Sequence, residues 1–143
     1  MVAAISEQAA RLDHVLFAGA THEPAVQLAE QLLGIVPKGL SRVFYSDDGS
    51  TAVEAAIKMV LQAWVHRGHP ERRVFLAMEG AYHGDTFGAM AASDPDPFFV
   101  PYEPLLFEVR RVRASAESLR TAIEELGERA AGLILEPLLQ GAA

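Results

Sequence analysis

The sequence predicts an α/β fold in which a mainly parallel sheet is covered by helices on both faces. Segments with helical periodicity alternate along the chain with short apolar runs, in the order helix, strand, helix, strand, short helix, strand, helix, strand. The run at 74–78 is continuously apolar, which is typical of a strand buried on both faces of a sheet. A length of 143 residues corresponds to about one domain.

The first 45 residues are predicted to contain one helix and one short strand. Residues 2–20 are weakly patterned and end in an expected loop at 17–20. A helix is expected to begin at 21–24, where proline is tolerated in the first turn, and to end at the glycines and proline of 34–39. The β-prone run at 43–45 is predicted to be a strand.

The next helix is predicted to be long and mostly apolar. Residues 47–50 break the preceding strand, and apolar residues then recur at helical spacing from Ala52 to Trp64. Because few polar residues interrupt it, we expect this helix to be buried on most sides. A basic last turn and Gly68 are expected to end it.

The second half of the chain is predicted to hold three strands and two helices. The strands are expected at 74–78, 105–109 and 132–135. A short helix is expected at 85–92, and Ser115 is expected to cap a longer one. A proline-rich, irregular connection separates the short helix from the second of these strands.

Three segments with chemistry-bearing residues follow predicted strands. They are 48–51, 80–85 and 136–141. Because ligands bind outside the carboxyl ends of the strands in open α/β sheets, we expect these segments to meet at one edge of the sheet. That edge is the predicted functional site.

Gly49, Ser50 and Thr51 open the long helix. A helix N-terminus exposes unpaired N–H groups, glycine allows close approach, and hydroxyls add donors, so the segment suits a phosphate. The alternative is a capping box, T-x-x-E, between Thr51 and Glu54, which needs no ligand. The G-x-x-x-x-G-K pattern of a P-loop is absent from the sequence.

Each of the other candidate residues has two possible roles. Tyr82 lies in a glycine-flanked loop, where its ring could cover a planar ligand or pack inward. His83 is either a base or ligand, or a hydrogen-bonded structural residue. Asp85 either caps the next helix or binds a polar substrate group, and Glu136 either faces the crevice or holds a neighbouring loop.

Composition excludes several classes of function. The formal net charge of −7 argues against nucleic acid as the main partner. The absence of cysteine excludes disulfides and thiolate chemistry, and the spacing of His66 and His69 does not indicate a metal site. With no apolar run long enough to span a bilayer and no secretory pattern at the N-terminus, we expect a cytoplasmic protein without a membrane partner.

At these motifs the sequence resembles the class III aminotransferases, fold-type I enzymes that use pyridoxal 5′-phosphate. Residues 48–58 look like the phosphate-cup segment of that family, and Tyr82-His83-Gly84 looks like its ring-stacking loop. Leu135-Glu136-Pro137 followed by Gln140-Gly141 looks like its E-P…Q-G segment. The three matches have the family's order and spacing and together cover most of 21–143.

Within this family, the sequence most resembles one subfamily, the aminotransferases of biotin biosynthesis. The resemblance is carried by 82–90 with Asp94-Pro95, and by 21–25. In that subfamily S-adenosylmethionine donates the amino group and 8-amino-7-oxononanoate accepts it to give 7,8-diaminononanoate, and the enzyme is a homodimer. Alternatives are another class III aminotransferase acting on diamines or ω-amino acids, or a non-catalytic module that binds a phosphate-bearing ligand or a full-length partner. Asp85 and the following Thr-Phe-Gly-Ala-Met discriminate between the two enzymes.

The resemblance implies roles for individual residues. The cofactor-binding residues would be Gly49, Ser50, Thr51, Tyr82 and His83. The substrate-binding residues would be Tyr82, Asp85 and Glu136. Residues 16–19 resemble the loop that the family lends to the partner subunit, with Ala18 in place of an expected glycine.

No catalytic residue is assigned within the chain. The resemblance implies that the Schiff-base lysine, the aspartate beside the pyridine nitrogen and the substrate-binding arginine lie beyond residue 143. Lys38 lies in a Pro-Lys-Gly turn and Lys58 lies about two turns into the long helix, so neither is expected to replace that lysine. We therefore expect an N-terminal fragment that is inactive alone, with an N-terminal segment at 1–20 and an incomplete cofactor-binding large domain at 21–143.

Overall fold

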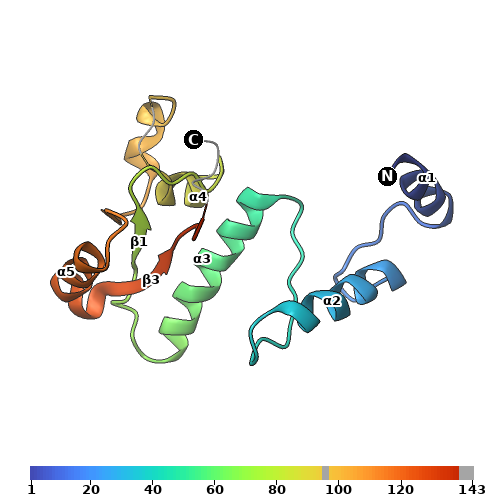
Figure 1. The fold of residues 1–143 in the computed structure, drawn as a ribbon, viewed down its shortest axis with the longest axis horizontal. Coiled ribbons are helices and arrows are strands. Elements are labelled where there is room, and N and C mark those ends of the chain that lie inside the picture. The colour runs from blue at the N-terminus through green and yellow to red at the C-terminus, as the bar shows by residue number, and fades with distance from the viewer. Residues whose placement is uncertain (95–96, 139–143) are drawn as a thin grey trace. The chain divides into compact units, whose positions relative to one another are not determined.

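The computed structural model describes residues 1–94 and 97–138. The chain forms two compact units, Met1–Tyr45 and Ser46–Ala143. The first unit contains α1 (Val2–Arg11) and α2 (Glu23–Ile35) (Figure 1). Residues 2–20 were expected to be weakly patterned, so α1 was not predicted, and none of its residues is buried. The predicted start of α2 is confirmed.

The strand predicted at 43–45 is wrong. In the part of the chain that the structure describes, no strand pairs with these residues. Tyr45 is held instead by its side chain, because its hydroxyl donates a hydrogen bond of 2.6 Å to the Ala25 carbonyl and its ring lies 5.7 Å from that of Phe17. A short β-prone run does not form a strand unless a neighbouring backbone completes the ladder.

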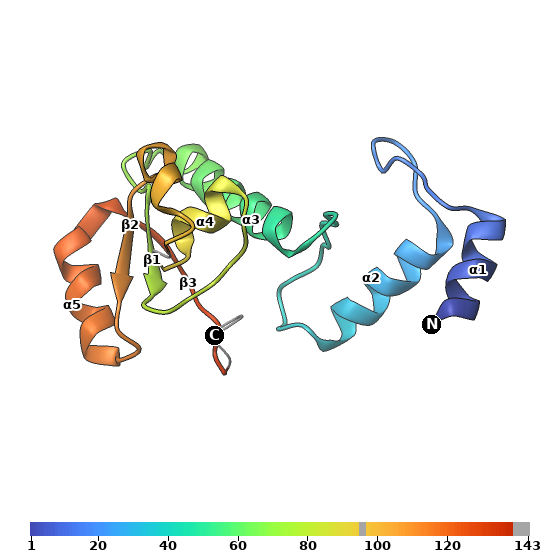
Figure 2. The ribbon, with the colours of Figure 1, turned by 90° about the horizontal axis from the view of Figure 1, so that it is seen from above.

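The second unit is built on a parallel sheet, which confirms the predicted fold class. Its described strands are β1 (Val74–Met78), β2 (Val109–Val112) and β3 (Ala130–Ile134), in the spatial order β2-β1-β3 (Figure 2). Both pairings are parallel, and Phe75 of β1 lies opposite Val109 and Gly132.

The second strand begins four residues later than predicted. The apolar residues at 105–109 suggested a strand, but a 3-10 helix, η1 (Val100–Leu105), occupies the start of this segment. Pro104 lies inside that helix and contributes no N–H to a sheet ladder. Pairing with β1 therefore starts at Val109.

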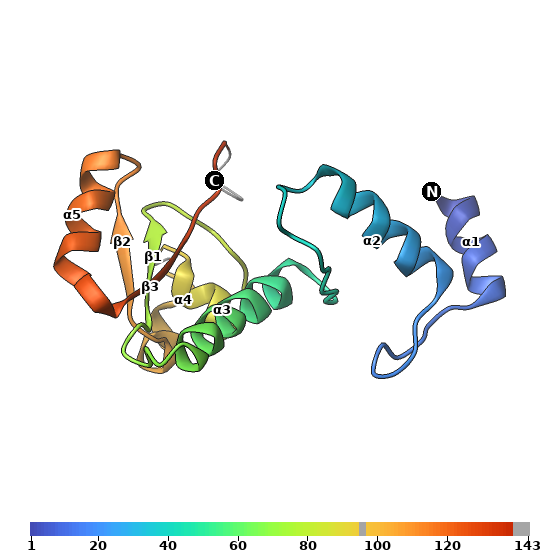
Figure 3. The ribbon, with the colours of Figure 1, turned by 90° about the horizontal axis from the view of Figure 1, so that it is seen from below.

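Helices cover both faces of the sheet (Figure 3). On one face α3 (Gly49–His66) packs against Phe75 through Ile57. On the other face α5 (Ala116–Leu126) packs against Leu76 and Val112 through Ala122. Successive residues of a strand point to opposite faces, so the apolar run of β1 supplies both cores.

The expectation that α3 is buried on most sides is wrong. Ile57 is its buried residue, while Met59 is 48% exposed and Val65 is 57% exposed. A single stripe of this apolar helix therefore contacts the sheet.

Every helix within residues 1–94 and 97–138 is too short or too polar to span a lipid bilayer.

The C-terminal end of α3 is anchored where β3 begins. The indole N–H of Trp64 donates to the Ala131 carbonyl at 2.7 Å, and the Arg72 guanidinium lies 4.7 Å from the Trp64 ring centroid. Arg72 also donates to the Ala130 carbonyl at 3.1 Å. Because this end is fixed at the start of a strand, the N-terminus of α3 lies toward the carboxyl edge of the sheet.

Candidate functional site

The N-terminus of α3 is closed by Asp48. The Asp48 carboxylate accepts the Thr51 N–H at 2.8 Å, and the Thr51 hydroxyl oxygen accepts the Asp48 N–H at 3.1 Å. The capping box therefore joins Asp48 to Thr51, and the predicted box between Thr51 and Glu54 is wrong. Aspartate is a favoured N-cap residue, so α3 begins at Gly49, one residue before the hydroxyls of Ser50 and Thr51.

Donors for an anion remain at Gly49 and Ser50. The N–H groups of Thr51 and Ala52 both bond to Asp48, whereas the first two N–H groups of a helix have no partner inside it. A Cβ placed on Gly49 would meet no heavy atom of the described residues within 4 Å. A ligand could thus approach this backbone closely.

The Tyr82 loop, residues 79–86, connects β1 to the short helix α4 (Phe87–Ala92). Its first half is held by Asp94, whose carboxylate accepts the Gly80 N–H at 2.7 Å and whose N–H donates to the Ala81 carbonyl at 2.7 Å. The Arg111 guanidinium lies 3.6 Å from the same carboxylate.

The second half of the Tyr82 loop rests on Ser50. The Asp85 N–H donates to the Ser50 hydroxyl oxygen at 3.0 Å, and the Thr86 hydroxyl donates to the Ser50 carbonyl at 3.3 Å. Gly84 makes this contact possible, because it has φ +129° and an added Cβ would lie 2.7 Å from the Ser50 Cβ. The structure therefore brings two of the predicted motifs together.

Tyr82 and Asp85 form a pair on the exposed side of the loop. Hydrogen bonding to the Asp85 carboxylate raises the pKa of the Tyr82 phenol. Tyr82 is 40% exposed, so its ring does not pack inward. Asp85 does not cap α4 either, because Thr86 occupies the N-cap position.

His83 lies on the inner side of the loop. Its backbone N–H donates to the Ser93 hydroxyl oxygen at 2.9 Å, and the Ser93 hydroxyl donates to the Ala89 carbonyl at 2.9 Å. Its Nε2 is buried and has no hydrogen-bond partner among residues 1–94 and 97–138. Burial lowers the pKa of His83, and the negative charge of Glu136 partly opposes that shift.

Glu136 therefore lies near enough to His83 to influence it, which links the segment after β3 to the Tyr82 loop. Gln140 and Gly141, the other half of the predicted E-P…Q-G motif, lie outside the described residues. The charge of Glu136 would favour a protonated imidazole, while burial favours the neutral ring. Because burial is the larger effect, His83 is held as a neutral donor and acceptor at neutral pH.

The role of Glu54 in the site was not predicted from the sequence. Its Oε2 accepts the Thr86 hydroxyl at 2.9 Å and the Gly88 N–H at 2.8 Å, so it holds the start of α4. One signal was available, because Glu54 is one of few polar residues on an apolar helix and follows Ser50 by one turn. Its partners, more than 30 residues away, could not be read from the local pattern.

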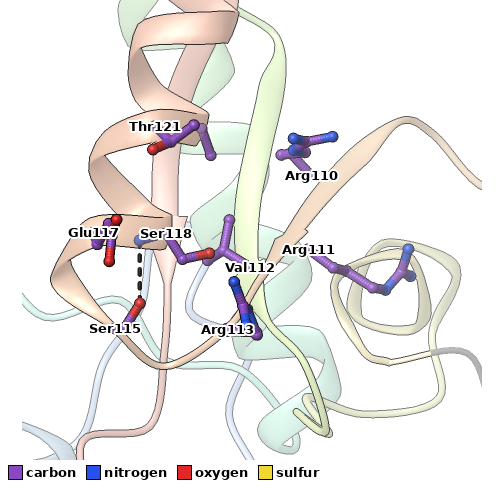
Figure 4. Close-up of a pocket in the computed structure, with 9 residues that line it drawn as sticks. Arg110, Arg111, Val112, Arg113, Ser115, Glu117, Ser118 and Thr121 are labelled. Carbon is purple, nitrogen blue, oxygen red and sulfur yellow. Dashed lines mark hydrogen bonds between the residues drawn. The ribbon is translucent and has the colours of Figure 1, made fainter.

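A cavity lies between β2 and the start of α5 (Figure 4). It has a volume of about 240 Å³, and its lining includes Arg110, Arg111, Arg113, Ser115 and Ser118. The Ser115 hydroxyl caps α5 by accepting the Ser118 N–H at 3.1 Å, and Arg110 pairs with Glu125 at 2.6 Å. Arg111 donates to the carbonyls that end α4. The side chains of Ser115, Arg110 and Arg111 are therefore engaged in contacts that hold the fold.

The chain is similar to known aminotransferases along its whole length. The sequence model of the family described as aminotransferase class III matches residues 1–143. The adenosylmethionine-8-amino-7-oxononanoate aminotransferase of Synechococcus elongatus is 48% identical over 99% of the chain, and that of Geobacter sulfurreducens is 39% identical over 97%. These matches span 37% and 35% of the two relatives, so the chain covers about a third of their length.

Solved structures show the same similarity. The crystal structure of adenosylmethionine-8-amino-7-oxononanoate aminotransferase from Methanocaldococcus jannaschii superposes with a TM-score of 0.89 at 37% identity, over 98% of this chain and 33% of that one. A PLP-bound amine transaminase from an uncultivated Pseudomonas species superposes with a TM-score of 0.86 at 30% identity, over 98% of this chain and 36% of that one.

Proposed function

Because the chain belongs to the class III aminotransferases, we propose that it forms part of the pyridoxal 5′-phosphate-binding domain of an aminotransferase of biotin biosynthesis. In the proposed reaction S-adenosylmethionine donates an amino group to the 7-keto group of 8-amino-7-oxononanoate, which gives 7,8-diaminononanoate. The relatives named adenosylmethionine-8-amino-7-oxononanoate aminotransferase, at 48% and 39% identity, support this pair of substrates. Asp85 and the residues after it, which resemble the same subfamily, support it too.

The residues present fit the cofactor. Gly49 and Ser50 offer the open N–H groups of a helix N-terminus, where the helix dipole favours a phosphate. The Ser50 hydroxyl oxygen accepts the Asp85 N–H, so the hydroxyl proton of Ser50 is available to donate to a phosphate oxygen. The orphaned Nε2 of His83 offers a further polar atom on the loop that carries Tyr82. When bound, pyridoxal 5′-phosphate supplies the carbon that carries the amino group and a ring that withdraws electrons from it.

The side chains of the Tyr82 loop would orient the reactants. The exposed Tyr82 ring would cover one face of the cofactor ring and exclude water from it. Asp85 would accept a hydrogen bond from a polar substrate group, and its bond to the Tyr82 phenol fixes both side chains. Glu136 would contact the substrate from the segment after β3. Thr51 is assigned to the cofactor as well, although its N–H and hydroxyl are engaged by Asp48.

The same proposal covers assembly and location. The family homodimer and a cytoplasmic location are proposed for the protein, and residues 21–143 are proposed as part of the large domain. The full match to the family model supports the domain assignment.

One contact supports the proposal most directly: the hydrogen bond from the Asp85 N–H to the Ser50 hydroxyl, which holds the Tyr82 loop beside the N-terminus of α3, where we propose that the phosphate binds. The test is a titration of the chain with pyridoxal 5′-phosphate, followed by ligand absorbance and by phosphorus NMR. Ser50→Ala removes a donor to a charged acceptor and should weaken binding about 10- to 150-fold. Ser118→Ala, which removes a hydroxyl beside the cavity between β2 and α5, is the matched control.

Pyridoxal, which lacks the phosphate, should bind far more weakly than pyridoxal 5′-phosphate. Equal binding of the two ligands, or equal binding by Ser50→Ala and Ser118→Ala, would show that the N-terminus of α3 does not hold the phosphate. The proposal for the cofactor site would then fail.

A further inference from the structure

We propose that Glu54 is a positioning residue that holds the Tyr82 loop against the N-terminus of α3 through Thr86 and Gly88. The inference rests on the proposed function in one respect, namely that the loop carries the residues assigned to cofactor and substrate. Its physical basis is independent of any ligand. It consists of hydrogen bonds between a helix side chain and a segment more than 30 residues away.

Glu54 and Ser50 form two consecutive attachment points on one side of α3. They are four residues apart, so one helical turn places them on the same face. Ser50 binds the Asp85 N–H and the Thr86 hydroxyl, while Glu54 binds the Thr86 hydroxyl and the Gly88 N–H. Thr86 contacts both residues and joins the two attachments. The end of the Tyr82 loop is thereby aligned along the first two turns of α3.

A carboxylate at this position supplies what α4 lacks. Its N-cap residue, Thr86, makes no side-chain cap to the helix. Glu54 takes that role from the neighbouring helix, because a carboxylate near a helix N-terminus accepts an orphan N–H and complements the helix dipole. Gly88 leaves room for it: an added Cβ would lie 2.7 Å from the Glu54 Cδ.

The Tyr82 loop is anchored on both sides of the Tyr82–Asp85 pair. Asp94 holds the first half of the loop, and Ser50 and Glu54 hold the second half. Tyr82 and Asp85 lie between these anchors, and their mutual hydrogen bond requires both to keep their places. Loss of Glu54 would release the start of α4 and loosen the Tyr82–Asp85 pair.

The test measures loop geometry directly and needs no cofactor. Glu54→Ala, Glu54→Gln and Glu124→Ala are compared, the last as a control that removes an exposed carboxylate from α5. The first readout is hydrogen exchange at the Gly88 amide. The second is the pH titration of the Tyr82 phenol by NMR of carbon-13-labelled tyrosine, with Tyr82→Phe used to assign the signal.

Glu54→Ala should speed exchange at Gly88 by about tenfold or more, since the amide loses a bond to a charged acceptor. It should also move the Tyr82 titration toward lower pH, because the phenol loses its fixed carboxylate partner. Glu54→Gln retains an acceptor oxygen and should fall between Glu54→Ala and the wild type. It also serves as the informative variant if Glu54→Ala does not fold.

Two results would overturn the inference. One is a Tyr82 titration in Glu54→Ala that matches the wild type although the melting temperature falls, which would show a purely structural role. The other is exchange at Gly88 that is as slow in Glu54→Ala and Glu54→Gln as in Glu124→Ala. Failure of pyridoxal 5′-phosphate to bind would count against the proposed function and would leave these readouts unchanged.

Discussion

Gly84→Ala is the substitution that should damage the candidate site most directly. Gly84 is buried where the Tyr82 loop crosses the first turn of α3. Two independent features demand glycine there. Its φ of +129° lies in a region that residues with a Cβ rarely adopt, and a Cβ would lie 2.7 Å from the Ser50 Cβ and 2.9 Å from the Ser50 Cα.

The cost can be worked out from these two features. Holding a non-glycine residue in such a backbone conformation costs about 1–3 kcal/mol. Overpacking against atoms that cannot move aside costs a further 1–3 kcal/mol or so, because the contact includes the backbone of a capped helix. The substitution should therefore lower the free energy of unfolding by roughly 2–6 kcal/mol, as the sum of these ranges. It should also separate Asp85 from Ser50.

Urea denaturation followed by circular dichroism measures this loss. The matched control is Gly68→Ala, at φ +81°, where an added Cβ would meet no described heavy atom within 4 Å. That control carries the backbone strain without the collision, so it should cost about 1–3 kcal/mol. If Gly84→Ala is no more destabilising than Gly68→Ala, the close packing of the loop on Ser50 is refuted.

Three further predictions concern charge and chemistry. Burial lowers the pKa of His83 from its ordinary 6.5, so the unfolded chain binds the proton more readily and stability should fall as the pH drops below about 6.5. His83→Gln should weaken that acid sensitivity, and denaturation curves at several pH values would test it. Asp85→Ala should return the pKa of Tyr82 toward its ordinary value, because the phenol loses its carboxylate partner. The affinity for pyridoxal 5′-phosphate should stay nearly unchanged, because the N–H that binds Ser50 belongs to the backbone and remains in the variant. Parallel titrations of the phenol and of the cofactor would test both expectations. The 143-residue chain alone should transfer no amino group from S-adenosylmethionine to the keto acid, because neither lysine is placed to form the Schiff base: Lys38 belongs to the first unit, and Lys58 lies more than two turns into α3 with its side chain exposed. Product formation above a no-protein control would contradict this.

Local signals in the sequence were sufficient for much of the fold. Apolar periodicity placed α2, α3 and α5, the predicted Ser115 cap marked the start of α5, and a continuous apolar run placed β1 with both faces buried. Such features depend on residues within a few positions of one another. The predicted strand at 43–45 failed because strand formation depends on a distant partner, and the pattern of three residues carries no information about that partner.

The candidate site was predictable at the level of motifs but not of contacts. Ser50 and the Tyr82 loop were expected at the same edge of the sheet because each was predicted to follow a strand. The strand expected before Ser50 does not form, and Ser50 reaches this edge because the other end of α3 is anchored at the start of β3. The bond between Tyr82 and Asp85 and the burial of the His83 Nε2 depend on loop conformation. Loop conformation depends in turn on glycines and on side chains that are distant in the sequence, so the pattern of neighbouring residues does not reveal it.

The short helix α4 shows how charged residues in unexpected places shape the site. Arg111 lies in β2, where the sequence pattern had not placed a strand, and its guanidinium donates to the carbonyls of Ala91 and Ser93 at the C-terminal end of α4. Glu54 accepts hydrogen bonds at the opposite end. A cation at the C-terminus and an anion at the N-terminus both complement the helix dipole. A helix of six residues is too short to be stable alone, so these two side chains, together with burial, account for its formation. Because α4 directly follows the Tyr82 loop, the charges that secure the helix also determine where the loop ends.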